Sequence, residues 1–163
     1  MTIRPAQPAD RDFVLALADR LVSFDVPVFR SKEEFADGDR RVLAAWFNRL
    51  PDDSSAEARR AEADEALFIA ELDGHRAGCA YLVTLVDFFT ERPHAHLSVL
   101  AVTAVAEGRG VGSALLDYCQ AWARQRGSDH LTLNALVTNA RARAFYERRG
   151  FAGEYLRYLL PLK

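Results

Sequence analysis

Three glycines at alternate positions, Gly108, Gly110 and Gly112, make the part of the chain best suited to holding a ligand. Glycine has no Cβ and tolerates positive φ, so such a loop can turn several backbone N–H groups towards one point. The amphipathic stretch that follows adds the positive end of a helix dipole and its unpaired first-turn donors. We therefore predict a cradle for an anionic group, most simply a phosphate.

Three other interpretations of the glycine loop compete with this one. A P-loop needs a Gly-Lys-Ser/Thr ending, but no lysine lies between Glu33 and Pro161, which excludes it. A dinucleotide fingerprint starting at Gly108 would place Ser113 at its last position. It would also follow the first strand of a βαβ unit, whereas this loop lies about two-thirds of the way along the chain, so a nicotinamide enzyme is disfavoured. A glycine-rich turn without a ligand stays open.

A second motif narrows the choice. With it, the chain resembles the GNAT superfamily of acyl-CoA-dependent N-acetyltransferases over at least residues 66–163. The family's pyrophosphate loop, Arg/Gln-x-x-Gly-x-Gly/Ala, is matched by residues 107–112, except that Glu107 replaces the usual Arg or Gln. The family's pantetheine segment is matched without a gap by Asn139, Ala142, Phe145, Tyr146, Glu147, Gly150 and Phe151.

The resemblance implies a function and a set of contacts. The reaction would move an acetyl group from acetyl-CoA to a primary amine by direct attack in a ternary complex, the partners being a coenzyme A thioester and a small amine or peptide amine. The glycine loop would hold the pyrophosphate, and the strand before it would supply backbone donors to the oxyanion. The implied acetyl-CoA-binding residues are Leu100, Ala101, Val102, Gly108, Arg109, Gly110, Val111, Gly112, Ser113, Asn139, Ala142 and Phe145.

Tyr146 occupies the family's general-acid position, where a phenol protonates the departing thiolate. For the general base, many relatives carry an acidic residue where this chain has Ser98. Strand alternation places Ser98 on one face with two histidines, and His96 is our candidate base, with Ser98 holding a relay water. Glu71 is an alternative, and attack by the neutral fraction of the amine would need no base. No metal-ligand set is expected.

Glu107 is the clearest departure from the family pattern. A carboxylate facing the pyrophosphate would repel it, so we expect this side chain to turn into solvent while its N–H still serves the cradle. The departure, together with the missing acidic base, leaves a second function open: a non-catalytic acyl-CoA-binding or sensing domain on the same fold. The retained Tyr146 argues against that alternative.

Composition bounds the remaining possibilities. A chain of 163 residues predicts a single domain spanning residues 1–163. The formal net charge of −2 gives no reason to expect a nucleic-acid partner. There is no apolar run long enough for a bilayer and no signal peptide, so we expect no membrane association and a cytoplasmic location. Cys79 and Cys119 stand within apolar patterns and are expected to be buried thiols.

Periodicity predicts an α+β fold with the order β-α-α-β-β-β-α-β-α-β, and the resemblance implies a mixed sheet of about six or seven strands flanked by four helices. Gly38 is expected to split the second helical region, and the polar stretch 52–65 to form a loop or frayed helix. Exposed strand edges and an apolar last strand predict a homodimer. Asp25, Asp37, Asp39 and the turn 24–29 are candidates for contacting the amine. The expected strands are 2–4, 67–72, 77–85, 94–102, 131–136 and 155–160, and the expected helices are 8–22, 31–47, 111–126 and 139–150.

Overall fold

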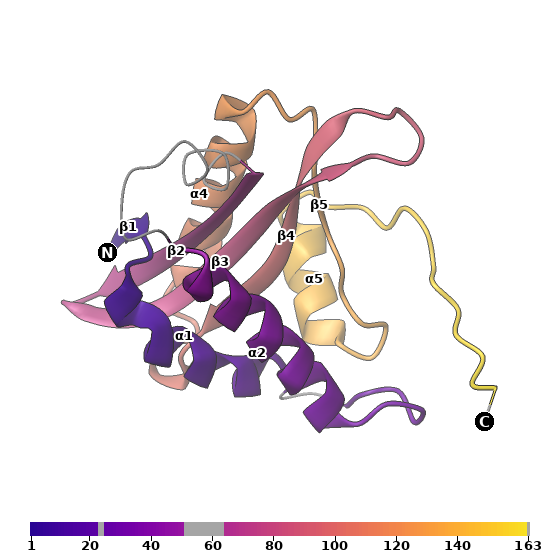
Figure 1. The fold of residues 1–163 in the computed structure, drawn as a ribbon, viewed down its shortest axis with the longest axis horizontal. Helices are drawn as coiled ribbons and strands as arrows, with labels where there is room; N and C mark the ends of the chain where they lie inside the picture. The colour runs from indigo at the N-terminus through magenta and orange to yellow at the C-terminus, as the bar shows by residue number, and fades with distance from the viewer. Residues whose placement is uncertain (23–24, 51–63, 163) are drawn as a thin grey trace.

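The structure, a computed structural model, describes residues 1–22, 25–50 and 64–162. The predicted segment 52–65 and Phe24 therefore lie largely or wholly outside the described residues. The elements follow the predicted order up to the last strand (Figure 1). They are β1 (Thr2–Pro5), η1 (Pro8–Asp10), α1 (Arg11–Leu17), η2 (Ala18–Val22), α2 (Lys32–Asn48), β2 (Glu65–Leu72), β3 (His75–Val86), β4 (Pro93–Val102), η3 (Ala104–Ala106), α4 (Val111–Gln125), β5 (Leu131–Leu133) and α5 (Ala140–Arg148).

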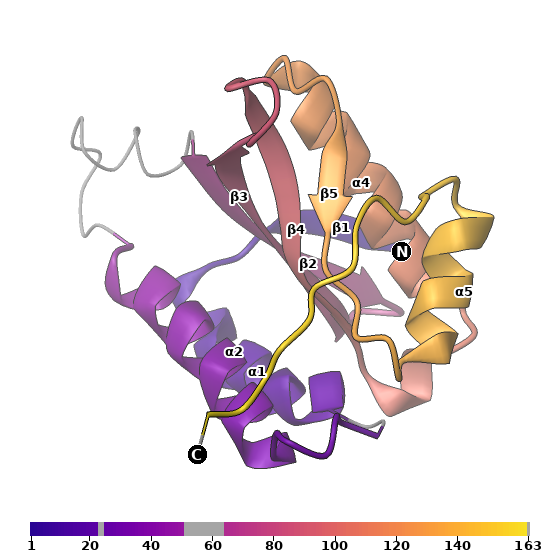
Figure 2. The ribbon, with the colours of Figure 1, turned by 90° about the vertical axis from the view of Figure 1, so that its right-hand side faces the viewer.

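One sheet with the order β1-β2-β3-β4-β5 forms the centre of the molecule. Its strands pair antiparallel except for β4 and β5, which are parallel. Helices α1 and α2 cover one face, while α4 and α5 cover the other (Figures 1 and 2). Each face has its own buried cluster, the first around Leu43 and Tyr81 and the second around Leu82 and Leu115. The predicted α+β class with a mixed sheet is confirmed.

The second helical region is one helix, so the expected break at Gly38 is wrong. Ser31 and Glu34 form the predicted capping box: Ser31 Oγ accepts from Glu34 N at 3.1 Å, and Glu34 Oε2 accepts from Ser31 N at 2.8 Å. Burial of Leu43 and Phe47 on one face holds α2 together through the glycine. Apolar burial worth about 1.5–3 kcal/mol per large side chain outweighs the cost of about 1 kcal/mol for one helical glycine.

The expected last strand is absent, so the sheet of the described residues has five strands rather than six or seven. Residues 152–162 have no strand pairing and extend away from the body (Figure 1). Tyr158 and Leu162 are each 88% exposed. Strand β5 is only three residues long, which leaves too short an edge to pair a strand over 155–160. An apolar alternation in the sequence does not reveal whether a partner edge exists.

A β-bulge in β4 creates the geometry of the site. The register of β3 and β4 shifts where Tyr81 pairs with Val99 and Leu82 pairs with Leu97, which leaves Ser98 as the extra residue. The bulge also reverses the side-chain alternation of β4, so that Leu97 and Val99, two positions apart, lie on opposite faces of the sheet. Leu97 packs against α4, whereas Val99 packs with the α1–α2 cluster. Strand β5 ends at Leu133, opposite Leu97. Beyond the bulge, the outer edge of β4 has no neighbouring strand among the described residues.

Two further expectations can be compared with the structure. Cys79 and Cys119 are free and buried, as predicted. Among the described residues, no helix combines the length and apolar character that crossing a bilayer requires.

Candidate functional site

The glycine loop joins the end of β4 to the start of α4. Gly108 and Gly110 have φ values of 73° and 81°, a region that favours glycine, and Gly110 is the N-cap residue of α4. A Cβ on Gly112 would lie 3.7 Å from Val102 Cγ2 and 3.8 Å from Phe145 Cζ, which is ordinary contact distance. Gly112 therefore faces the space between β4 and α5.

Some backbone N–H groups of this loop have hydrogen-bond partners and others do not. Glu107 N donates to Ala104 O and Arg109 N to Ala106 O, both at 3.3 Å, so these two N–H groups are already engaged. The expectation that Glu107 contributes its N–H to the cradle is therefore wrong. In the described part of the chain, the unengaged donors of the loop and the first turn are the N–H groups of Gly108, Gly110, Val111, Gly112 and Ser113. Together with the helix dipole they form a site suited to an anion.

Glu107 is exposed, as expected, but its carboxylate is not free. Its carboxylate forms ion pairs with Arg20 Nη2 at 2.5 Å and with Arg141 Nη2 at 2.8 Å. The hydrogen bond from Arg141, followed by the charges of both arginines, lowers the pKa of Glu107. The net charge of this group beside the loop is therefore positive, since two guanidinium groups surround one carboxylate. This positive charge offsets the repulsion between Glu107 and a pyrophosphate. These pairs also tie η2 and α5 to the loop.

Arg109 lies on the other side of the loop. Its Nη2 is 2.7 Å from Asp73 Oδ2 in the β2–β3 turn, and both side chains are more than half exposed. A pair this exposed contributes little to stability. Its guanidinium is therefore available to exchange the carboxylate for a phosphate at small cost.

The open edge of β4 presents two backbone positions. Thr103 N donates to Ala77 O at 2.8 Å, so the pair Thr103–Ala77 is a hydrogen-bonded one. Antiparallel alternation then directs the N–H groups of Val102 and Leu100 away from β3, and that of Ala101 towards it. Consistently, Val102 O accepts from Arg20 Nε at 2.9 Å rather than from β3. Leu100 and Val102 thus present their N–H groups at the edge that β5 leaves open.

Helix α5 closes the other side of this space. Asn139 is its N-cap, and its Oδ1 accepts from Ala142 N at 3.0 Å. Phe145 and Tyr146 are half-buried against the cluster around α4, with their rings 5.2 Å apart in an edge-to-face arrangement. The local pattern Asn-x-x-Ala-x-x-Phe-Tyr thus folds as one capped turn followed by an inward-facing aromatic pair.

The protonation states near Tyr146 are set by burial. Burial raises the pKa of the Tyr146 phenol to about 12, with a smaller contribution from Cys119. Burial likewise raises the pKa of the Cys119 thiol to about 12. At neutral pH the phenol is therefore a proton donor, while Cys119 is not a thiolate nucleophile.

The candidate base lies further along β4. His96 Nδ1 is 2.8 Å from Thr132 Oγ1, and Asn134 Nδ2 is 3.5 Å from His96 Nε2. Burial and the neighbouring His94 lower the pKa of His96. Ser98 is exposed at the bulge. Among the described residues, no contact joins His96 to Tyr146.

Glu71, the alternative base, faces a different part of the molecule. Its carboxylate pairs with Arg4 at 2.8 Å on β1, and β3 separates it from β4. This pairing removes Glu71 from the candidate site.

Thr132, which contacts the candidate base, carried no sequence signal, and the amine-binding candidate Asp39 carried only a weak one. Thr132 was not predicted, because its contact with His96 depends on the parallel β4–β5 register that pairs these two residues. Asp39 was one of three equal candidates, and it is set apart by burial. Desolvation raises the pKa of Asp39, and this carboxylate has no ion pair in the described part of the chain. Asp37, in contrast, pairs with Arg40 at 2.8 Å.

Known acetyltransferases are similar to this chain in sequence. A streptothricin acetyltransferase from Streptomyces lavendulae is 32% identical over 108 residues, which cover 63% of this chain and 55% of that protein. A mycothiol acetyltransferase from Beutenbergia cavernae is 49% identical over 53 residues, which cover 32% of this chain and 18% of that protein. This chain therefore matches about half of the first relative's length and less than a fifth of the second's.

The fold is similar to that of solved structures along its whole length. The crystal structure of a ribosomal-protein-alanine N-acetyltransferase from Brucella melitensis superposes with a TM-score of 0.67 at 17% identity, and covers 99% of this chain and 100% of that one. The family profile described as Acetyltransferase (GNAT) matches residues 30–151, which include the glycine loop and the aromatic pair of α5. The chain therefore belongs to the GNAT family of acetyltransferases.

Proposed function

We propose that this protein is an N-acetyltransferase that moves an acetyl group from acetyl-CoA to a primary amine by direct attack in a ternary complex. The observation that carries the proposal is the continuity of two donor sets: the five unengaged N–H groups from Gly108 to Ser113, and the open edge of β4 that leads into them. The first set is suited to a pyrophosphate and the second to a thioester carbonyl.

The residues of this groove fit acetyl-CoA as the donor. The N–H groups of the loop would hold the pyrophosphate, with Arg109 beside them. Gly112 leaves room between Val102 and Phe145 for an extended arm. Asn139 and Ala142 form the capped first turn of α5 that borders this space.

Each chemical requirement of the transfer has a candidate group. The N–H groups of Leu100 and Val102 would stabilise the negative charge that develops on the carbonyl oxygen, with Ala101 as the spacer between them. Tyr146 would protonate the departing thiolate. The pKa of Cys119, raised to about 12, disfavours an acyl-cysteine route and supports direct attack by the amine.

We assign the general base to His96, with Ser98 holding the relay water. His96→Ala is expected to lower kcat by about 100-fold, since general-base catalysis contributes at least that much. Turnover at a fixed saturating acetyl-CoA concentration measures the effect. His75→Ala, at an exposed position at the start of β3, is the matched control. An unchanged rate in His96→Ala would show that the amine needs no base from the protein.

Asp39 is the proposed recognition group for the cationic amine. It lies one turn before the buried Leu43, on the face of α2 that packs inward, and its helix contacts η2, which in turn contacts β4. Asp39→Asn is expected to raise KM for the amine about 10-fold with little change in kcat, because a half-buried charge–charge contact is worth about 1.4 kcal/mol or more. Asp37→Asn is the control, and equal KM values in the two variants would exclude Asp39 from amine recognition.

The streptothricin acetyltransferase and the ribosomal-protein-alanine N-acetyltransferase suggest two acceptor classes, an antibiotic-like small molecule and a protein N-terminus. The test of the proposed function is amine-dependent release of coenzyme A thiol from acetyl-CoA, measured over a panel of both classes. Acceleration by an amine, with acetylated product found by mass spectrometry, is expected. Tight acetyl-CoA binding with no acceleration by any member would instead favour the non-catalytic binding or sensing domain.

We also propose a homodimer, supported by the exposed segment 152–162. The segment carries exposed apolar side chains, among them Tyr155, Tyr158, Leu160 and Leu162. Contact between these segments of two copies would remove this apolar surface from water. Light scattering should give a dimer for the full chain and a monomer for a chain ending at Gly153. A monomeric full chain at high protein concentration would contradict the proposal.

A further inference from the structure

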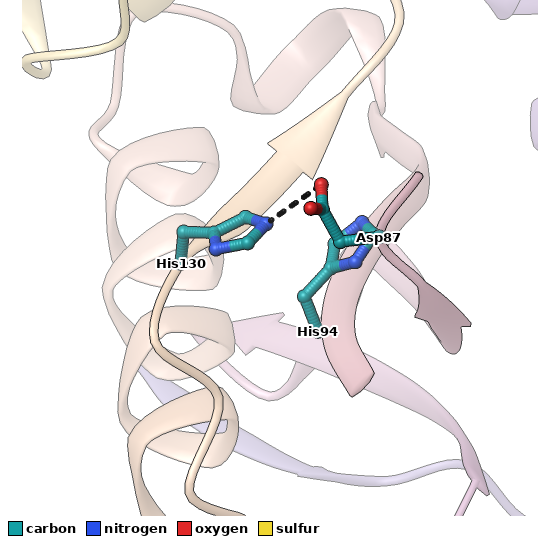
Figure 3. A group of neighbouring side chains, drawn as sticks. All are labelled: Asp87, His94 and His130. Atoms are coloured by element: carbon teal, nitrogen blue, oxygen red, sulfur yellow. Dashed lines mark ion pairs between the residues drawn. The ribbon is translucent and has the colours of Figure 1, made fainter. Parts of the chain in front are cut away.

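Three side chains far apart in the sequence meet at the end of the sheet, where the β3–β4 hairpin lies beside the start of β5 (Figure 3). Asp87 follows the last residue of β3, and His94 is the second residue of β4. His130 directly precedes β5. The parallel pairing of Ala95 with Leu131 sets the two histidines side by side. One ring nitrogen of each histidine and a carboxylate oxygen of Asp87 lie within 4.8 Å of one another.

The carboxylate of Asp87 is held in one orientation. Its Oδ1 accepts hydrogen bonds from Phe89 N at 3.1 Å, from Thr90 N at 2.8 Å and from Thr90 Oγ1 at 2.8 Å. These bonds leave Oδ2 directed towards the histidines, 3.7 Å from His130 Nε2. They also lower the pKa of Asp87, so that the group is a carboxylate at neutral pH.

His94 has a buried ring nitrogen without a partner, which the ion pair between Asp87 and His130 does not explain. The residue is 6% exposed, its Nε2 lies 3.0 Å from Thr132 Oγ1, and its Nδ1 has no hydrogen-bond partner. A buried ring nitrogen left without a partner costs about 1–3 kcal/mol. A pair between Asp87 and protonated His130 would satisfy those two groups but would leave His94 Nδ1 unpaired. It would also set a cation against the His94 ring, which stacks on His130 at 4.6 Å and 22°.

We propose that Asp87, His94 and His130 form a binding site for a divalent transition-metal ion of the zinc type. Two imidazoles and one carboxylate are an established ligand set for such ions, and three protein ligands leave a position for water. The metal would bond to His94 Nδ1, the nitrogen that otherwise has no partner. This site is separate from the groove proposed for acetyl transfer. No metal-ligand set was expected from the sequence.

The surroundings of the three ligands match those of metal sites. Metal-bound histidines commonly donate their other N–H to an oxygen, as His94 Nε2 can to Thr132 Oγ1, and bound carboxylates are themselves hydrogen-bonded, as Asp87 is. Bonds of about 2.0–2.1 Å in a tetrahedral site separate ligand atoms by about 3.3 Å, so the rings must rotate to close separations of up to 4.8 Å. The side chain of His130 is 40% exposed and has room to make that rotation.

Metal binding at His94 would also affect the candidate base His96, because both histidines contact Thr132. With Nδ1 on the metal, His94 Nε2 carries the proton and donates to Thr132 Oγ1. The Thr132 hydroxyl then donates to His96 Nδ1, which lies 2.8 Å away. The ion would therefore keep the proton of neutral His96 on Nε2, so the proposed role of His96 as a base belongs to the metal-free protein.

The test uses full-length protein without a polyhistidine tag, freed of metal with a chelator. Titration with Zn²⁺ by calorimetry and with Co²⁺ by visible absorption is expected to show one tetrahedral ion per chain. His130→Ala and Asp87→Asn should each weaken binding by about 100-fold, since even partners outside the ligand shell cost 10–100-fold. His75→Ala, which keeps the three ligands, should bind as the wild type does.

Both variants replace side chains at the end of the sheet, and Asn retains the Oδ1 acceptor of Asp87, so they are expected to keep the fold. Thermal melting without metal verifies this. His94→Ala is not used, because it would remove a buried side chain. Binding that is unchanged in both variants, or that is lost in His75→Ala, would overturn the proposal. Absence of any ion at millimolar Zn²⁺ would overturn it as well. None of these readouts depends on acetyl transfer.

Discussion

Tyr146→Phe should lower kcat by about 100-fold, equivalent to about 2.7 kcal/mol of transition-state stabilisation, while leaving acetyl-CoA affinity almost unchanged. The substitution removes only the hydroxyl, and the phenyl ring keeps its packing against Phe145 and Phe151. The loss should therefore appear in turnover and not in stability. Steady-state kinetics with thermal melting of both proteins separates these effects.

The protonation state of Tyr146 adds a second expected result. Because burial raises the pKa of this phenol to about 12, it stays protonated throughout the neutral and mildly alkaline range. Rates of the wild type should therefore show no alkaline decline from Tyr146 below about pH 10. Tyr118→Phe, on the face of α4 that contacts Phe68, is the matched control. A Tyr146→Phe enzyme with wild-type turnover would remove the phenol from the mechanism.

Gly112→Leu should weaken acetyl-CoA binding by at least about 100-fold, which corresponds to about 2.7 kcal/mol of binding free energy. A Cβ at this position points between Val102 and Phe145, so a leucine side chain would fill the space proposed for the pantetheine arm. The backbone φ at Gly112 lies outside the positive region, so the fold tolerates a side chain there. Calorimetric titration with acetyl-CoA measures the loss.

Gly112→Ala provides the control for this prediction. Its methyl group would lie at 3.7 and 3.8 Å from the nearest atoms, which is ordinary packing distance, so binding should change by less than 10-fold. Equal affinities for the leucine and alanine variants would place acetyl-CoA elsewhere on the protein.

Features that depend on local sequence were predictable. Positive φ at Gly108 and Gly110, the Ser31–Glu34 capping box and the Asn139 cap each follow from residues within one turn. Such features need no knowledge of the tertiary fold, because the atoms involved are neighbours along the chain.

Features that depend on strand register or on distant partners were not predictable. Glu107 meets Arg20 across 87 positions, and the contact of His96 with Thr132 requires the β4–β5 pairing. The bulge at Ser98 changes which face later residues occupy, and residues 99–102 are all apolar, so the sequence does not mark the change of face. The apolar alternation of 155–160 indicates a strand only where an edge is available, and β5 offers three residues.

The most direct test of the central claim is thermal melting with and without acetyl-CoA, with NADH and ATP as controls. A ligand that binds only the native state, at about 100 times its Kd, adds about 2.7 kcal/mol, which raises the Tm of a domain this size by several degrees. The account predicts a rise in Tm with acetyl-CoA alone. An unchanged Tm at saturating acetyl-CoA, or a rise with NADH instead, would contradict it.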